Sequence, residues 1–201
     1  MGVCVDGGNE TGSRLETMNE NAQKPSIEIR RMLESDKPKV LDLIAEARGD
    51  ALSPEERAER GFIQGTVNEG LLDAALAGPG IYLAVSGDEV AGFVMSWGPE
   101  QIGEQNRVGT ESLRLAAEAF PGSRVFMSGP VAISERFQGQ GLYRKMASAR
   151  DAALAGDFQC AVQFVDTANV KSLNVHRHMG MTELEQFEAN GSQFVPFAYA
   201  L

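Results

Sequence analysis

Apolar positions along the chain follow two periods, one typical of helices and one typical of strands. From Val40 to Ala47 they recur every three or four residues behind a capping pair, Ser35-Asp36, which predicts a helix. A second helix is expected over Val67–Ala77, where Gly78-Pro79-Gly80 ends it. Between these two, Ser53-Pro54-Glu55-Glu56 is a capping box and predicts the start of a further short helix.

Short apolar runs predict the strands. The first is expected over Ile27–Leu33. Ile81–Val85 and Val90–Ser96 flank a polar turn and predict a β-hairpin. Further strands are expected over Arg124–Ile133 and Ala161–Val165, because both segments are apolar and bounded by polar or turn-forming residues.

The rest of the pattern is a helix and a second hairpin. A polar, turn-rich loop at 98–111 precedes a helix expected over Glu111–Phe120. Near the C-terminus, strands over Leu184–Phe187 and Phe194–Tyr199 flank Asn190-Gly191, a strong tight-turn signal. The order is therefore a strand, helices, two or three strands, a helix, a strand, a helix and a hairpin, which predicts an α/β (α+β) fold.

Residues 1–26 show no period and are rich in Gly, Asn, Glu, Thr and Ser, so we expect a disordered tail. Residues 27–201 then form one domain, and this length allows a sizeable core.

Composition excludes several classes of function. The net charge of −10 argues against a nucleic-acid partner, which requires a basic face. No run is long enough to span a membrane, and no secretory signal is visible. The two cysteines, Cys4 and Cys160, have no metal or disulfide spacing, so we expect a cytoplasmic protein without a bound metal.

The chemistry concentrates in one stretch, Val131–Met146, where an apolar run passes through a glycine loop into a helix. Glycines such as Gly139 and Gly141 let the backbone approach a ligand closely. The first N–H groups of a helix have no internal partner and favour an anion. The stretch therefore predicts a phosphate-binding loop, although a glycine turn without a ligand stays open.

This loop resembles motif A of the GNAT superfamily of acyl-CoA N-acyltransferases, [QR]-x-x-G-x-[GA]. Two registers fit, Arg136–Gly141 literally and Gln138–Tyr143 with Tyr143 at the last small position. We prefer the second, because it places Phe137 and Leu142 where the family commonly has an aromatic and a large apolar residue.

The resemblance implies a GNAT-like fold, a mixed and mostly antiparallel sheet flanked by helices, with acetyl-CoA as the cosubstrate. In that fold the strand before the loop carries a bulge and splays from the next strand. Here Gly129-Pro130 interrupts that strand, because proline lacks a ladder donor. The residues implied to bind the coenzyme through the strand and loop are Val131, Ala132, Ile133, Gln138, Gly139, Gln140, Gly141, Leu142 and Tyr143.

A second segment, Asn169–Met181, resembles the family's motif B, N-x-x-[AS]-x-x-[LF]-Y-x-x-x-G-F. Asn169 and Ser172 fall on motif positions and are implied to help hold the coenzyme. His176 replaces the usual Tyr, which many members are assigned to use as general acid, so it is the candidate catalytic residue. A capped amphipathic helix without a ligand is the alternative interpretation.

The sequence therefore predicts an N-acetyltransferase that moves an acetyl group from acetyl-CoA to an amine by direct attack. The general base is not identified. The position of the Glu found in some members is Met127, and Asp166 is a weak candidate. The acceptor, a small molecule or a peptide amine, and a homodimer are left open. A non-catalytic acyl-CoA-binding regulatory module and a site for another phosphate ligand are the competing hypotheses.

Overall fold

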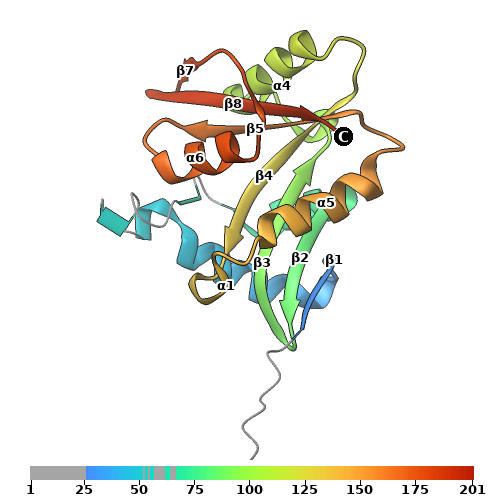
Figure 1. Ribbon diagram of the computed structural model, residues 1–201, viewed down its shortest axis with the longest axis vertical. Helices are drawn as coiled ribbons and strands as arrows, with labels where there is room; N and C mark the ends of the chain where they lie inside the picture. The colour runs from blue at the N-terminus through green and yellow to red at the C-terminus, as the bar shows by residue number, and fades with distance from the viewer. Residues whose placement is uncertain (1–25, 52, 54, 57–61, 64–66) are drawn as a thin grey trace, which may run out of the picture.

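The computed structural model describes residues 26–51, 53, 55–56, 62–63 and 67–201. Within these ranges the protein forms an eight-stranded mixed sheet with helices on both faces (Figure 1). The strands are β1 Ile27–Arg31, β2 Gly80–Ser86, β3 Glu89–Trp97, β4 Val125–Ile133, β5 Cys160–Asp166, β6 Thr182–Glu183, β7 Phe187–Ala189 and β8 Ser192–Ala200. The α-helices are α1 Lys37–Ala47, α3 Glu69–Ala77, α4 Arg107–Ala119, α5 Leu142–Leu154 and α6 Val170–His178.

The strand order confirms the predicted mixed, mostly antiparallel sheet. It runs β1-β2-β3-β4-β5-β8-β6, and β7 also pairs with β8. Among the described strands, β4 and β5 form the parallel pair and every other pairing is antiparallel. A parallel pair needs a crossover connection, and α5 provides it.

Helices cover the two faces of the sheet separately. One cluster of apolar residues packs α1 and α3 against β2 and β3, and a neighbouring cluster packs Ala116 of α4 against β4, β5 and β8. On the other face, Leu142 and Met146 of α5 pack on β2 and β3, and Leu173 of α6 packs on β5 and β8. Figure 1 shows α5 crossing in front of the sheet, with α1 behind it.

The sheet opens between β4 and β5, as the family resemblance implies. β4 pairs with β5 only over Val125–Met127, whereas its pairing with β3 continues to Ile133. The pairing with β3 shifts register where the Gly129-Pro130 segment lies, so β4 bends there. The indole Nε1 of Trp97 donates a hydrogen bond of 2.6 Å to the carbonyl of Gly129 and holds the bend.

Two predicted elements differ from the structure. The helix expected from Glu111 begins at Arg107, because the Asn106 side chain accepts from the Gly109 N–H at 3.0 Å and caps it earlier. The strand expected over Leu184–Phe187 is wrong. The chain forms β6 and β7 instead, and their registers on β8 differ by one residue opposite Pro196, which has no N–H to donate.

Two predictions fall wholly or mostly outside the described residues. The tail expected over 1–26 lies outside them except for Ser26, and most of the helix after Ser53 does too. The capping box itself is present, because the Ser53 N–H donates to Glu56 Oε2 at 2.9 Å and the Glu56 N–H donates to Ser53 Oγ at 3.2 Å. Within the described ranges, no helix combines the length and apolar character needed to cross a bilayer.

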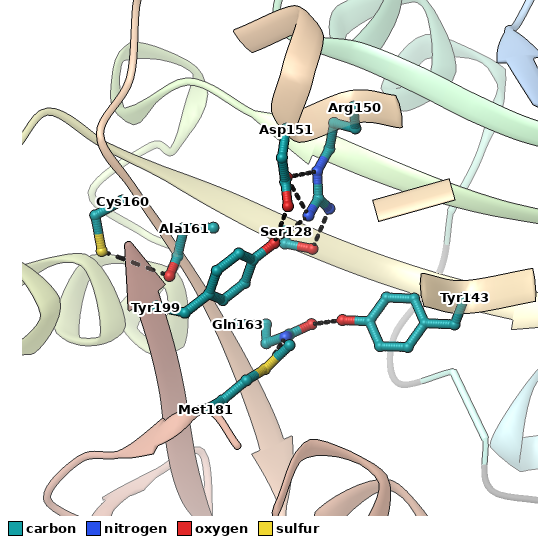
Figure 2. Close-up of polar contacts among 9 residues, drawn as sticks. All are labelled: Ser128, Tyr143, Arg150, Asp151, Cys160, Ala161, Gln163, Met181 and Tyr199. Atoms are coloured by element: carbon teal, nitrogen blue, oxygen red, sulfur yellow. Dashed lines mark hydrogen bonds and ion pairs between the residues drawn. The ribbon is translucent and has the colours of Figure 1, made fainter. Parts of the chain in front are cut away.

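A buried polar cluster ties α5 to the sheet at the point where β4 leaves β5 (Figure 2). We call its members Ser128, Arg150, Asp151 and Tyr199 the Arg150 network. Arg150 is fully buried and donates to Ser128 Oγ at 2.6 Å, Tyr199 Oη at 2.5 Å and Asp151 Oδ1 at 2.8 Å. Tyr199 Oη in turn donates to Asp151 Oδ2 at 2.8 Å. The guanidinium also lies 5.0 Å from the centroid of the Phe126 ring.

Replacing Arg150 should strongly destabilise the fold, because it leaves buried polar partners unpaired. We expect Arg150→Met to lower the free energy of unfolding by about 3 kcal/mol or more, measured by urea denaturation. Arg114→Met is the matched control, since Arg114 is half-exposed on α4, where it pairs with Glu111 and Glu118. It should change stability little. Equal losses in the two variants would contradict the role given to the network.

Candidate functional site

A cavity of about 400 Å³ lies where β4 and β5 diverge, and it brings together segments that are distant in the sequence. Its walls come from α1, β4, the glycine loop, the start of α5 and α6. The predicted site residues that line it are Val131, Ala132, Ile133, Gln138, Gly139, Gly141, Leu142, Tyr143, Asn169, Ser172 and His176. Gln140 is exposed in the loop and does not line it.

The wall formed by β4 presents backbone groups along an open edge. On the paired edge, the Ser134 N–H just after β4 donates to the Ala91 carbonyl of β3 at 2.9 Å. Because backbone groups of successive strand residues point to opposite edges, Val131 and Ile133 direct theirs toward the side that β5 has left. The Gln138 side chain confirms this direction, since its Nε2 donates to the Ile133 carbonyl at 3.3 Å.

The glycine loop delivers the N-terminus of α5 to the same cavity. Gly139 and Gly141 have φ of 75° and 68°, a left-handed conformation that side chains disfavour, and Gly141 is the N-cap of α5. No side chain caps this N-terminus, so its first N–H groups and the positive end of the helix dipole favour an anion there.

Lys171 is a site residue that the sequence analysis missed. It lines the cavity, and its Nζ donates to Gln138 Oε1 at 3.1 Å, so it reaches from α6 to the glycine loop. It also lines an adjoining hollow of about 520 Å³ together with Arg144 of α5. A cation in the first turn of a helix opposes the dipole, and this unfavourable placement is the signal that could have identified it.

Tyr143 stands where the family has a small residue, but its side chain does not block the N-terminus of α5. Its ring is buried between α5 and the sheet, and its hydroxyl donates to Gln163 Oε1 of β5 at 2.7 Å (Figure 2). Gln163 Nε2 in turn lies 2.9 Å from Met181 Sδ. Burial raises the pKa of the Tyr143 phenol, so it stays protonated.

Asn169 has a structural task at the edge of the cavity. Its Oδ1 accepts from the Ser172 N–H at 3.2 Å and caps α6, and its Nδ2 donates to the Phe62 carbonyl at 3.2 Å. Both ends of the amide are therefore in use within the protein. Asn169 therefore links the first turn of α6 to Phe62, and both residues line the cavity.

His176 is 7% exposed and lies on the cavity wall, stacked on Phe197 with ring centroids 5.2 Å apart. Its Nδ1 is 2.6 Å from the Ser172 carbonyl, which can only accept, so Nδ1 carries the proton. Burial lowers the pKa of the imidazole, and the carbonyl opposes this more weakly. The ring is therefore neutral at neutral pH with a lone pair on Nε2, which suits it to accept a proton rather than to donate one.

The candidate bases differ from those expected. Met127 is buried and carries no acid, and Asp166 does not line the cavity because its Oδ1 caps the Ala168 N–H at 2.8 Å. Two carboxylates that the sequence analysis missed, Glu46 of α1 and Glu135, line the cavity instead. Their shared location depends on the packing of α1 beside β4. In the described part of the chain, no cluster of three His, Cys, Asp or Glu residues could hold a metal.

Comparison with solved structures shows which fold this arrangement belongs to. A GNAT-family acetyltransferase from Streptococcus agalactiae matches at 15% identity with a TM-score of 0.59, covering 87% of this chain and 95% of that chain. A Salmonella typhimurium protein named as an acetyltransferase, solved with its cofactor acetyl-CoA, matches at 16% identity with a TM-score of 0.59, covering 88% and 94%.

The polyamine N-acetyltransferase of Drosophila melanogaster, which forms N-acetylagmatine, matches at 12% identity with a TM-score of 0.60, covering 88% of this chain and 100% of that chain. No protein-family model and no curated protein matches the sequence. The chain therefore has the GNAT acetyltransferase fold over most of its length.

The buried neutral state of His176 should make stability depend on pH. In the unfolded chain its pKa is about 6.5, and in the folded protein it is lower, so the unfolded state binds more protons between the two values. Stability should rise with pH up to about 6.5 and then level off. We expect melting temperatures recorded from about pH 5 to 7 to show a smaller slope for His176→Phe than for the parent. His178→Phe, at an exposed position, should keep the parent slope. Parallel curves for all three proteins would contradict this assignment.

Proposed function

We propose that this protein is an acetyl-CoA-dependent N-acetyltransferase of the GNAT superfamily. The observation that carries the proposal is the cavity in which the open edge of β4, the uncapped N-terminus of α5 and His176 meet. The fold comparison supports the coenzyme, because a structural neighbour is solved with acetyl-CoA. We also propose a cytoplasmic location, since the two cysteines have no disulfide spacing.

In this proposal the coenzyme lies along the walls of the cavity. The loop amides around Gly139 and Gly141 and the dipole of α5 hold the pyrophosphate, and Lys171 adds a positive charge beside them. The backbone groups of Val131 and Ile133 on the open edge bind the amides of the pantetheine arm, as an added strand would. Acetyl-CoA supplies an activated thioester at the end of that arm.

The reaction is acyl transfer from sulfur to nitrogen. An uncharged amine attacks the thioester carbonyl, the C–N bond forms, and the C–S bond breaks to release the coenzyme thiolate. The amine nitrogen loses a proton, which His176 Nε2 accepts directly or through a water. N–H groups of the β4 edge stabilise the developing oxyanion.

The acceptor we propose is a small molecule that carries a cationic group besides the amine that attacks uncharged. Glu46 and Glu135 line the cavity, and a net charge of −10 favours the approach of a cation. The fly enzyme with the same fold forms N-acetylagmatine, which makes agmatine and short polyamines the first acceptors to test.

Two substitutions favour a second candidate, a module that binds acyl-CoA without turnover. The family's Tyr is replaced by a buried histidine, and the position of its Glu is the buried Met127. Release of free thiol from acetyl-CoA in the presence of an amine panel distinguishes the two functions.

Coenzyme binding should depend on charge at Gly141. We expect acetyl-CoA at a hundred times its Kd to stabilise the parent by about 2.7 kcal/mol in thermal-shift measurements, and NAD or ATP to stabilise it less. Gly141→Asp should abolish this stabilisation, because it adds a negative charge beside the pyrophosphate.

Gly141→Asn is the matched control, since Asn has the same shape without the charge and tolerates the left-handed conformation. It should retain most of the stabilisation. Gly87→Asp, at φ of 60° in the β2–β3 turn, controls for backbone strain. Full stabilisation of Gly141→Asp by acetyl-CoA would refute the anion site.

Removing the proton acceptor should slow turnover without weakening the binding of the coenzyme. We expect His176→Phe to lower kcat with agmatine by about 10²- to 10⁴-fold, the range for loss of acid–base catalysis, while the Kd for acetyl-CoA stays constant. His178→Phe should behave as the parent. If His176→Phe turns over at the parent rate, His176 is a packing residue and another group takes the proton.

A further inference from the structure

We propose that Tyr143 is the floor of the cavity and restricts the coenzyme to a short acyl group. The inference rests on the proposed function and goes beyond it, because it concerns which acyl-CoA is accepted. It is carried by the way side chains of α5 fill the gap between β4 and β5, where backbone pairing has stopped.

The first step is the position of Tyr143 relative to the reacting end. Tyr143 and His176 both line the cavity, and their ring centroids are 6.0 Å apart. With the pyrophosphate at the glycine loop and the pantetheine along the β4 edge, the thioester comes next to His176. An acyl chain that extends further toward the interior then meets the Tyr143 ring within a few methylene groups.

The second step is that this ring is held in place. Its hydroxyl donates to Gln163 Oε1 at 2.7 Å, so the side chain reaches from α5 to β5 across the gap, as Figure 2 shows. Gln163 is itself buried, and its Nε2 contacts Met181 Sδ. Breaking the tyrosine–amide hydrogen bond in this buried location would leave two polar groups unpaired, so the ring cannot move aside at little cost.

The third step is that the gap behind the ring cannot widen. The Arg150 network joins α5 to Ser128 of β4 and to Tyr199 of β8, the strand that pairs with β5. Figure 2 shows this network beside the Tyr143–Gln163 pair. The Arg150 network therefore fixes the spacing of α5 and the strands around the ring, and the ring itself sets the depth of the cavity.

The experiment measures the Kd of acetyl-CoA and of butyryl-CoA by calorimetry without an acceptor. The parent should bind butyryl-CoA at least about tenfold more weakly, since a pocket of limited size discriminates by roughly this factor per methylene. Tyr143→Ala should raise the affinity for butyryl-CoA relative to acetyl-CoA by about tenfold or more. Tyr143→Leu, which removes the ring but keeps an apolar side chain, should shift the preference in the same direction. It replaces Tyr143→Ala in the experiment if the alanine variant does not fold.

Two controls separate selectivity from stability. Tyr143→Phe keeps the ring and loses only the hydrogen bond to Gln163, so it should retain a preference for acetyl-CoA. Tyr199→Phe removes one hydroxyl from the Arg150 network but keeps the bond from Arg150 to Ser128 and does not alter the cavity wall, so it should lower the melting temperature while leaving the ratio of the two Kd values unchanged.

Equal affinity of the parent for the two thioesters, or an unchanged ratio in Tyr143→Ala and Tyr143→Leu, would overturn the inference and leave the proposed function standing. A parent protein that binds neither thioester would overturn the proposed function itself.

Discussion

The structure depends on one constraint, the loss of backbone pairing between β4 and β5 after Met127. The two strands are parallel and stay together for three residues, and a bend at Gly129-Pro130 then carries β4 away. Since unpaired backbone groups must find other partners, the open edge of β4 is available to bind a ligand with amide groups. The cavity, the glycine loop and the start of α5 all lie along this opening.

Helix α5 performs two tasks at the opening, one at each end. Its N-terminus presents free N–H groups and the positive end of the dipole to the cavity. Further along, Arg150 fastens it to Ser128 and Tyr199, so the helix takes over the role of the missing ladder hydrogen bonds. The N-terminus of α5 is thereby rigidly connected to the open edge of β4, which reduces the cost of ordering the cavity when a ligand arrives.

The environment of His176 shows how burial changes the role of a residue. At its ordinary pKa an imidazole exchanges protons readily near neutral pH, and the family comparison implies a donor at this position. Desolvation keeps the ring neutral, and the hydrogen bond to the Ser172 carbonyl places its proton on Nδ1. A donor role would need the charged form that the surroundings disfavour, so a proton acceptor fits better.

The sequence by itself determined the elements and the order in which they follow one another, because periodicity, caps and turn residues are local. The glycine loop, the cap at Asn169 and the interruption at Gly129-Pro130 were all visible in it. It misplaced the start of α4 and the strands before β8, since an asparagine cap and a one-residue register shift opposite Pro196 outweighed the apolar pattern.

Only the tertiary structure decided which side chains share the cavity and in what state. Lys171 of α6, Glu46 of α1 and Glu135 in the turn after β4 reach it because these segments pack around one opening, and no local pattern shows that they share it. The protonation of His176 and the hydrogen bond from Tyr143 to Gln163 likewise arise from burial against distant strands. Desolvation and long-range packing have no counterpart in the sequence until the chain has folded.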